Sequence, residues 1–234
     1  MSESNLVTLS VVALAVGVAC AAFTLLHILL GHRQPMRVME WVWPLTALYF
    51  GPLALWAYWR IGRAKARPSQ APGMAAMSSP GAAPHPISLR AVLISDAHCG
   101  GGCVLGDVVG EVLVAVTGLV IASSMQWTSI IVDFSFAYVF GILFQYFSIQ
   151  PMRHLPPKTA WLLAVKADTL SIVAFVAGML GWMLLATPAL VGQGLSPASP
   201  VYWFMMQLSM VCGFVVALPV NWLLLRTGVK HVMD

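Results

Sequence analysis

The sequence has few charged residues and few cysteines, and each shortage excludes a class of protein. Only 9% of its 234 residues are charged and 59% are hydrophobic, whereas about 25% of a soluble globular chain is charged. The four cysteines, two of them inside one apolar run, do not form the disulfide framework of a secreted scaffold. The chain also lacks a basic stripe interleaved with aromatic residues, which argues against nucleic acid as a partner. What remains is an integral membrane protein.

Long apolar runs set the fold class. A run of about 20 residues is long enough to cross a bilayer as a helix, and six such runs are present. They predict an all-α polytopic membrane protein, a bundle of about six transmembrane helices. The runs cover residues 7–30, 38–58, 99–122, 128–149, 160–185 and 201–225.

Positive charge predicts the orientation, because cytoplasmic loops carry an excess of Lys and Arg. With six spans, one side receives only Arg33 and Arg37 and the other receives most of the remaining basic residues. We therefore expect a multi-pass membrane protein with both termini in the cytoplasm. Residues 1–66 form a two-helix hairpin in this scheme, residues 67–87 a disordered cytoplasmic linker rich in Pro, Ala and Gly, and residues 88–234 a four-helix module.

Ionisable residues inside a span are costly and mark a functional site by default. On a helix of 100° per residue, Cys99, Cys103, Asp107 and Glu111 lie four positions apart on one face, and Asp96 falls in the same arc. A neighbouring stripe of small residues allows another helix to approach closely, so this polar face is expected to point into the bundle. The stripe consists of Gly102, Gly106 and Gly110.

The fifth run contributes Lys166 and Asp168. We expect Lys166 to pair with Asp107 or Glu111 and to neutralise a buried carboxylate, while Asp168 faces another neighbour. These four residues are the candidate ion or proton path. The competing interpretation is a charge-neutral network that fixes only the register of the helices.

The start of the third run is a candidate metal site made of Asp96, His98, Cys99 and Cys103. Thiolate and imidazole ligands suit soft or borderline ions, so a copper or zinc ion is expected. The alternatives are that the cysteines are small apolar fillers, or that they form a redox pair that exchanges electrons with a quinone. Further candidates are the polar residues and thioethers elsewhere in the spans: Gln145, Asn221, Asp133, His27, Met206 and Met210.

Several segments of the back part of the chain carry a resemblance to a known family. They are residues 96–103, 106–107, 150–153, 166–168 and 219–222. Through them the chain resembles the bacterial multi-pass membrane family catalogued as domain of unknown function 4396. The resemblance implies a protein of the bacterial cytoplasmic (inner) membrane. It also implies that the four-helix module is the functional unit, with the polar residues of its spans at the centre, and it brings no activity.

The residues therefore predict a protein that binds, and translocates, a soft or borderline metal ion, with copper favoured. Asp96, His98, Cys99 and Cys103 would be ligands near the cytoplasmic mouth, and Lys166 would supply the counter-charge. Expected partners are the lipid bilayer, the metal ion, and a metal chaperone or redox partner. The alternatives are a membrane-embedded thiol or metal oxidoreductase, which makes enzyme status undecided at this stage, and a non-catalytic assembly subunit of a membrane complex.

Overall fold

The computed structural model describes residues 3–34, 36–62, 87–121, 123–153, 156–192 and 194–230. Most of the predicted linker, residues 67–86, lies outside them. The described chain is helical apart from short connections and one isolated bridge between Ile121 and Ser124. The elements are α1 (Glu3–Leu29), α2 (Met39–Phe50), α3 (Pro52–Ala57), the π-helix η1 (Tyr58–Gly62), α4 (Leu89–Thr117), α5 (Met125–Arg153), α6 (Pro157–Gly181), the π-helix η2 (Trp182–Ala186), α7 (Thr187–Val191) and α8 (Pro200–Arg226).

Within the described residues, five helical segments are long and apolar enough to cross a membrane. They are α1, α4, most of α5, the continuous α6–η2–α7 segment, and α8. The all-α polytopic fold is therefore confirmed. The difference from six crossings lies in the second predicted run, residues 38–58, which is divided between α2, α3 and the start of η1.

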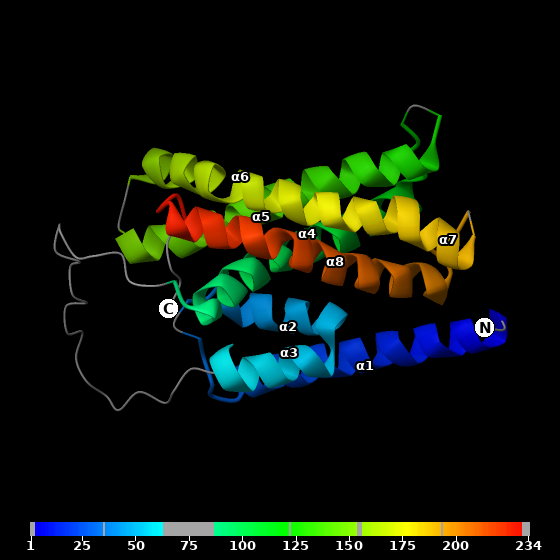
Figure 1. Ribbon diagram of the computed structural model, residues 1–234, viewed down its shortest axis with the longest axis horizontal. Helices are drawn as coiled ribbons and strands as arrows, with labels where there is room; N and C mark the ends of the chain where they lie inside the picture. The colour runs from blue at the N-terminus through cyan, green and yellow to red at the C-terminus, as the bar shows by residue number, and fades with distance from the viewer. Residues whose placement is uncertain are drawn as a thin grey trace.

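That second run forms a helical hairpin that turns back half-way along α1. A Cβ atom built on Gly51, between α2 and α3, would lie 3.7 Å from Val16 in the middle of α1. Both outer ends of the hairpin lie instead near the end of α1: the Tyr58 hydroxyl is 3.0 Å from His27 Nδ1, and the rings of Trp43 and Tyr58 are 5.7 Å apart. The hairpin therefore enters and leaves the bundle from the same end, as Figure 1 shows.

The sequence explains the break. Gly51 adopts a positive φ of 55°, and Pro52 has no N–H to donate to the Leu48 carbonyl four residues earlier. Gln207 of α8 supplies the missing donor, with its Nε2 atom 2.6 Å from the Leu48 oxygen. Gly17 of α1 leaves room for this contact, because a Cβ there would collide with the Leu48 oxygen. Three helices thus fix the tip of the hairpin.

The helices α4, α5, α6 and α8 form a four-helix module, with α1, α2 and α3 packed along one side (Figure 1). Small residues set the spacing of its helices. A Cβ on Gly102 would lie 2.7 Å from the Cα of Gly141 in α5, and one on Gly178 of α6 would lie 2.8 Å from the Cα of Gly213 in α8. The predicted close approach along the glycine stripe of α4 is therefore confirmed.

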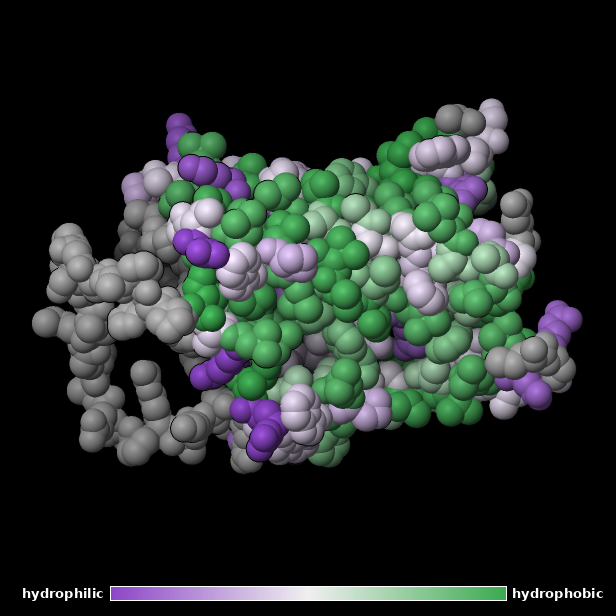
Figure 2. Space-filling model, viewed as in Figure 1, coloured by the Kyte–Doolittle hydropathy of each residue, from purple (hydrophilic) through white to green (hydrophobic). Residues whose placement is uncertain are grey.

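The two ends of the bundle differ in charge. Apolar side chains cover most of the visible face and hydrophilic ones gather toward its ends (Figure 2). The end at which α1 and α8 finish is named the basic end, because almost all described basic residues lie there in the chain: Arg33, Arg37, Arg60, Arg90, Arg153, Lys158, Arg226 and Lys230. The start of α1 lies at the opposite end from the end of α8 (Figure 1), whereas six crossings would have placed them at the same end.

Candidate functional site

The predicted polar face of α4 does point into the bundle. Its ionisable and thiol side chains are all at most 3% exposed: Asp96, His98, Cys99, Cys103, Asp107 and Glu111. Ser88 caps the start of this helix by accepting the Ala91 N–H at 3.2 Å, and Gly118 ends it with a φ of 63°. The helix is continuous through its three adjacent glycines.

The depth of the polar face differs from the prediction. The third run was expected to begin at Cys99, but α4 begins ten positions earlier, at Leu89. At 1.5 Å per residue, Asp96 therefore lies about 10 Å along the helix and Glu111 about 33 Å along it. The polar residues extend along most of α4 and are not confined to the cytoplasmic half of the module. We name this row of buried groups, with the side chains that meet it from other helices, the polar column.

The part of the column nearest the basic end contains a buried ion pair. Lys230 Nζ lies 2.7 Å from Asp168 Oδ1, and both side chains are 0% exposed. The same ammonium donates to Asn221 Oδ1 at 2.9 Å, and the Asn221 amide nitrogen donates to Asp96 Oδ1. These four residues, which come from α4, α6, α8 and the segment after α8, are named the lysine cluster.

Two serine hydroxyls complete the lysine cluster. Ser171 donates to Asn221 Oδ1 at 2.8 Å and Ser95 donates to it at 3.4 Å. Burial lowers the pKa of Lys230, but the Asp168 carboxylate, followed by Cys99 and Asp96, raises this pKa by more, so the ammonium form is favoured. Asp96 Oδ2 and Asp168 Oδ2 are buried and accept no hydrogen bond from the described residues.

The predicted role of Lys166 is wrong. Its side chain is exposed on α6, and it forms no ion pair with Asp107 or Glu111 in the described part of the chain. Lys230, which lies beyond the last apolar run, is the lysine that reaches the polar column. The prediction that Lys166 and Asp168 cannot face the same way agrees with this result, since Asp168 is buried.

The opposite part of the column is a group of carboxyls. Glu111 accepts a hydrogen bond from the Tyr202 hydroxyl of α8, and Asp133 of α5 lies against Gly110, the residue before Glu111, where an added Cβ would collide with Asp133 Oδ1. Asp107 lies one turn before Glu111 on the same face of α4. These residues, Asp107, Glu111, Asp133 and Tyr202, are named the carboxyl cluster. Asp107 Oδ2, Glu111 Oε2 and Asp133 Oδ1 have no hydrogen-bond partner in the part of the chain that the structure describes.

The middle of the column holds His98 and two free thiols, Cys99 and Cys103. Neither ring nitrogen of His98 has a hydrogen-bond partner within the described ranges, and the ring meets the edge of Phe144 at 6.0 Å. In the described residues no three His, Cys, Asp or Glu side chains are close enough to hold a metal ion together. The four predicted ligands are thus buried together on α4 but not gathered as a ligand set, and metal binding stays a prediction.

The helical hairpin also reaches the column. A Cβ on Gly100 would lie 2.8 Å from the Tyr49 hydroxyl, and one on Gly101 would lie 3.4 Å from Val42, so these two glycines allow α2 to pack on α4. The Tyr49 hydroxyl is buried without a partner among the described residues. The front part of the chain therefore contributes a side chain to the site.

The remaining candidate site residues lie in different parts of the bundle. Gln145 is buried on α5 with an unpartnered Oε1, counting only described residues, and Met206 and Met210 are buried in the core on α8. His27 lies with Tyr58 at the basic end of α1, so it is not on the far side of the membrane from the expected cytoplasmic charges.

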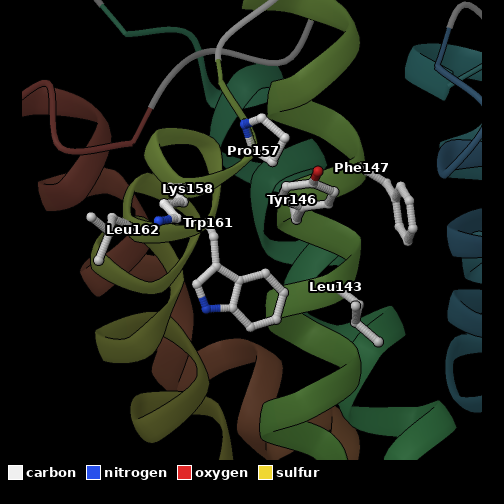
Figure 3. Close-up of a pocket in the computed structure, with 7 residues that line it drawn as sticks. All are labelled: Leu143, Tyr146, Phe147, Pro157, Lys158, Trp161 and Leu162. Carbon is white, nitrogen blue, oxygen red and sulfur yellow. The ribbon is translucent and has the colours of Figure 1, made fainter.

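A groove on the outside of the module lies apart from the polar column (Figure 3). It runs between α5 and α6 near the basic end and contains none of the residues of either cluster. It is lined by Leu143, Tyr146, Phe147, Pro157, Lys158, Trp161 and Leu162.

Sequence reasoning missed several side chains that meet α4. Lys230 and Tyr202 were the most consequential, because each donates directly to a buried carboxylate. A signal for Lys230 exists in Gly228, a glycine just beyond the helix end that marks a reversal of the chain. No comparable signal marks Tyr202, Ser95, Ser171 or Tyr49, since single polar residues are common in apolar helices.

Comparison with known proteins gives a family and no activity. Neither the curated proteins nor the solved structures contain a match to this chain. The family model described as domain of unknown function (DUF4396) matches residues 89–230, a range that begins with α4 and ends on Lys230. It covers more than half of the 234 residues and includes the whole four-helix module with both clusters. The chain belongs to this family.

Proposed function

We propose that this protein binds a cation inside its four-helix module and translocates it along the polar column. The observation that supports the proposal is an excess of buried carboxyls over buried cations. The module contains four buried acidic residues and a half-buried fifth, whereas one buried lysine, Lys230, pairs with Asp168. The four are Asp96, Asp107, Glu111 and Asp168, and the fifth is Asp133.

An unpaired carboxylate in a low-dielectric interior costs several kcal/mol even after relaxation of its surroundings. Lys230 neutralises one carboxylate, so the carboxyl cluster needs protons or another cation. Five buried carboxyl oxygens lack a hydrogen-bond partner among the described residues: Asp96 Oδ2, Asp107 Oδ2, Glu111 Oε2, Asp133 Oδ1 and Asp168 Oδ2. Oxygen atoms of this kind are ligands for cations and stations for protons.

The test is transport by purified protein in liposomes. Wild type should move protons, or a metal cation supplied outside, in response to an imposed membrane potential, as read by a trapped pH dye and by uptake of sodium, potassium, copper(I) and zinc separately. The double variant Asp107→Asn, Glu111→Gln should fall to the rate of protein-free liposomes. Glu40→Gln is the matched control, because Glu40 pairs with Arg33 at the surface of the basic end, 2.8 Å away, and should leave the rate unchanged. A double variant as fast as wild type would contradict the proposal.

The proposed setting is the bacterial inner membrane, with the basic end in the cytoplasm. This orientation follows the rule that basic loops stay inside, and it places the start of α1 outside and the end of α8 inside. A phosphatase that is active only outside the cytoplasm should be active when fused before α1 and inactive when fused after α8. Equal activity of the two fusions would favour the six-span arrangement.

A soft metal ion, copper or zinc, is the second candidate cargo. His98, Cys99 and Cys103 support it, since both thiols are free and fully buried and neither nitrogen of His98 is hydrogen-bonded to a described residue. Such donors suit Cu(I) and Zn²⁺. A rearrangement of α4 around its glycines would be needed to bring them together, and binding would release thiol protons, so the affinity should fall as the pH is lowered.

Elemental analysis by plasma mass spectrometry tests this cargo. The double variant Cys99→Ser, Cys103→Ser should lose the stoichiometric metal that wild type retains, while Cys20→Ser should keep it, because Cys20 packs in a separate small core on α1. Metal-free wild type after reconstitution with both ions would remove this candidate and leave the proton or a hard cation. A change in the thiol redox state on each cycle would instead support the oxidoreductase alternative.

A further inference from the structure

The position of Lys230 is unusual for a lysine. It lies beyond the end of α8, outside every described membrane-spanning helix, yet its side chain is fully buried inside the module. The chain reverses at Gly228, whose φ is 70°, and the Lys230 N–H returns to the Leu224 carbonyl at 3.0 Å. This turn sends the side chain back into the end of the polar column.

The groups around the ammonium form a cation site. Its contacts are oxygen atoms, Asp168 Oδ1 at 2.7 Å and Asn221 Oδ1 at 2.9 Å. Asn221 is held by the two serines and donates its amide nitrogen to Asp96, so its carbonyl oxygen stays directed at the cation. Two further carboxylate oxygens in the same cluster, Asp96 Oδ2 and Asp168 Oδ2, are buried and lack a partner within the described residues.

Stability alone does not explain such an arrangement, because a buried ion pair is often no better than well-packed apolar residues of the same volume. Lysine is suited to a different role, since its ammonium is a compact point charge on a flexible stem. The stem enters from a short turn at the end of the module, so its withdrawal leaves the helices in place. Arg226, the nearest basic neighbour in the chain, stacks over Trp222 at 5.0 Å and does not enter the cluster.

We propose that the Lys230 ammonium is a tethered occupant of a monovalent-cation site formed by Asp96, Asp168 and Asn221, and that the translocated cation replaces it there. This inference rests on the proposed function. The exchange of one unit charge for another leaves the net charge of the buried cluster unchanged, which is why the replacing ion is monovalent. The lysine then acts as an internal competitor at the basic end of the polar column.

The experiment measures cation binding separately from transport. Lys230→Met removes the charge and keeps an unbranched side chain, and Lys166→Met is the matched control on the exposed face of α6. Thermal unfolding in detergent is followed while sodium alone, potassium alone or magnesium alone is titrated. If Lys230 occupies the site most of the time, its removal should lower the half-saturating concentration of a monovalent cation by about tenfold or more, and Lys166→Met should behave as wild type.

A third variant keeps the result interpretable. Lys230→Met, Asp168→Asn removes both members of the ion pair and should show no stabilisation by sodium or potassium. If Lys230→Met folds poorly without salt, recovery on adding a monovalent cation, absent in the double variant, supports the inference. Equal half-saturating concentrations in wild type and Lys230→Met, or stabilisation by magnesium only, would overturn it. Binding in Lys230→Met without transport by any variant would support the site and overturn the proposed function.

Discussion

The two ends of the polar column neutralise their carboxyl groups in different ways. The lysine cluster holds a cation that belongs to the chain, with Lys230 and Asp168 both fully buried. In the carboxyl cluster, Tyr202 donates to Glu111, and in the described residues none of Asp107, Glu111 and Asp133 forms an ion pair. Both clusters use the same face of α4, so the difference comes from the side chains that the other helices bring to it. The carboxyl cluster therefore needs protons or a bound cation for neutrality, and the proposed function rests on this difference between the two ends.

The largest expected effect comes from making the same substitution at the two ends. Asp168→Asn leaves the Lys230 ammonium buried without its partner, which should lower the free energy of unfolding by about 3 to 5 kcal/mol. Asp107→Asn removes one of three neighbouring carboxyls, so it should leave this free energy unchanged or raise it. The measurement is unfolding in mixed micelles by titration with a denaturing detergent.

The control for that comparison is the double variant Lys230→Met, Asp168→Asn. It removes the unpaired ammonium and leaves Asp96 as the only carboxyl of the lysine cluster, which a proton can neutralise, so it should recover most of the stability that Asp168→Asn loses. Equal losses for Asp168→Asn and Asp107→Asn would show that the two ends are neutralised in the same way. The difference between the two clusters would then have no effect on the free energy of unfolding.

A smaller effect is expected at the hydroxyl of Tyr202. In Tyr202→Phe, Glu111 loses its donor, and the free energy of unfolding should fall by about 1.5 to 3 kcal/mol if the acceptor carries charge. Tyr138→Phe is the matched control, because the Tyr138 hydroxyl meets the neutral Thr169 hydroxyl at 3.0 Å and a neutral bond contributes only about 1 kcal/mol. Similar losses in the two variants would indicate that Glu111 is protonated in the resting protein, and the same unfolding titration measures both.

The sequence predicted the helical fold and the inward face of α4, because period and composition are local properties. The face was found from Cys99, Cys103, Asp107 and Glu111 alone, and every one of them is buried. The break at Gly51 was missed although a glycine followed by proline interrupts helices. The apolar residues on both sides of it continue the run, so a window of hydropathy averages over the break.

The partners of α4 could not be predicted, because they depend on which helices become neighbours. Lys166 and Lys230 have equal formal charge, and the mid-span position of Lys166 made it the stronger candidate. The structure selects Lys230, 62 positions from Asp168 in the chain, because a turn at Gly228 reverses its direction. The backbone turn beyond the end of α8 therefore determines which lysine pairs with Asp168. Helical periodicity carries no information about such a turn.

The smallest expected effect tests the close packing of α4 against α5 between the two clusters. Gly106 lies between them on α4, and a Cβ there would collide with the backbone of Ala137 in α5. Gly106→Ala should therefore force α4 and α5 apart and lower the free energy of unfolding by about 1 to 3 kcal/mol. Gly181→Ala is the control, because it is helical with no heavy atom within 4 Å of the added carbon, so alanine there should be neutral or stabilising.

Since the Lys230–Asp168 pair does not involve α5, Gly106→Ala should also slow cation movement while the binding expected at the lysine cluster persists. If both substitutions have the same effect on unfolding, α4 and α5 are not packed closely enough for the two clusters to act as one column.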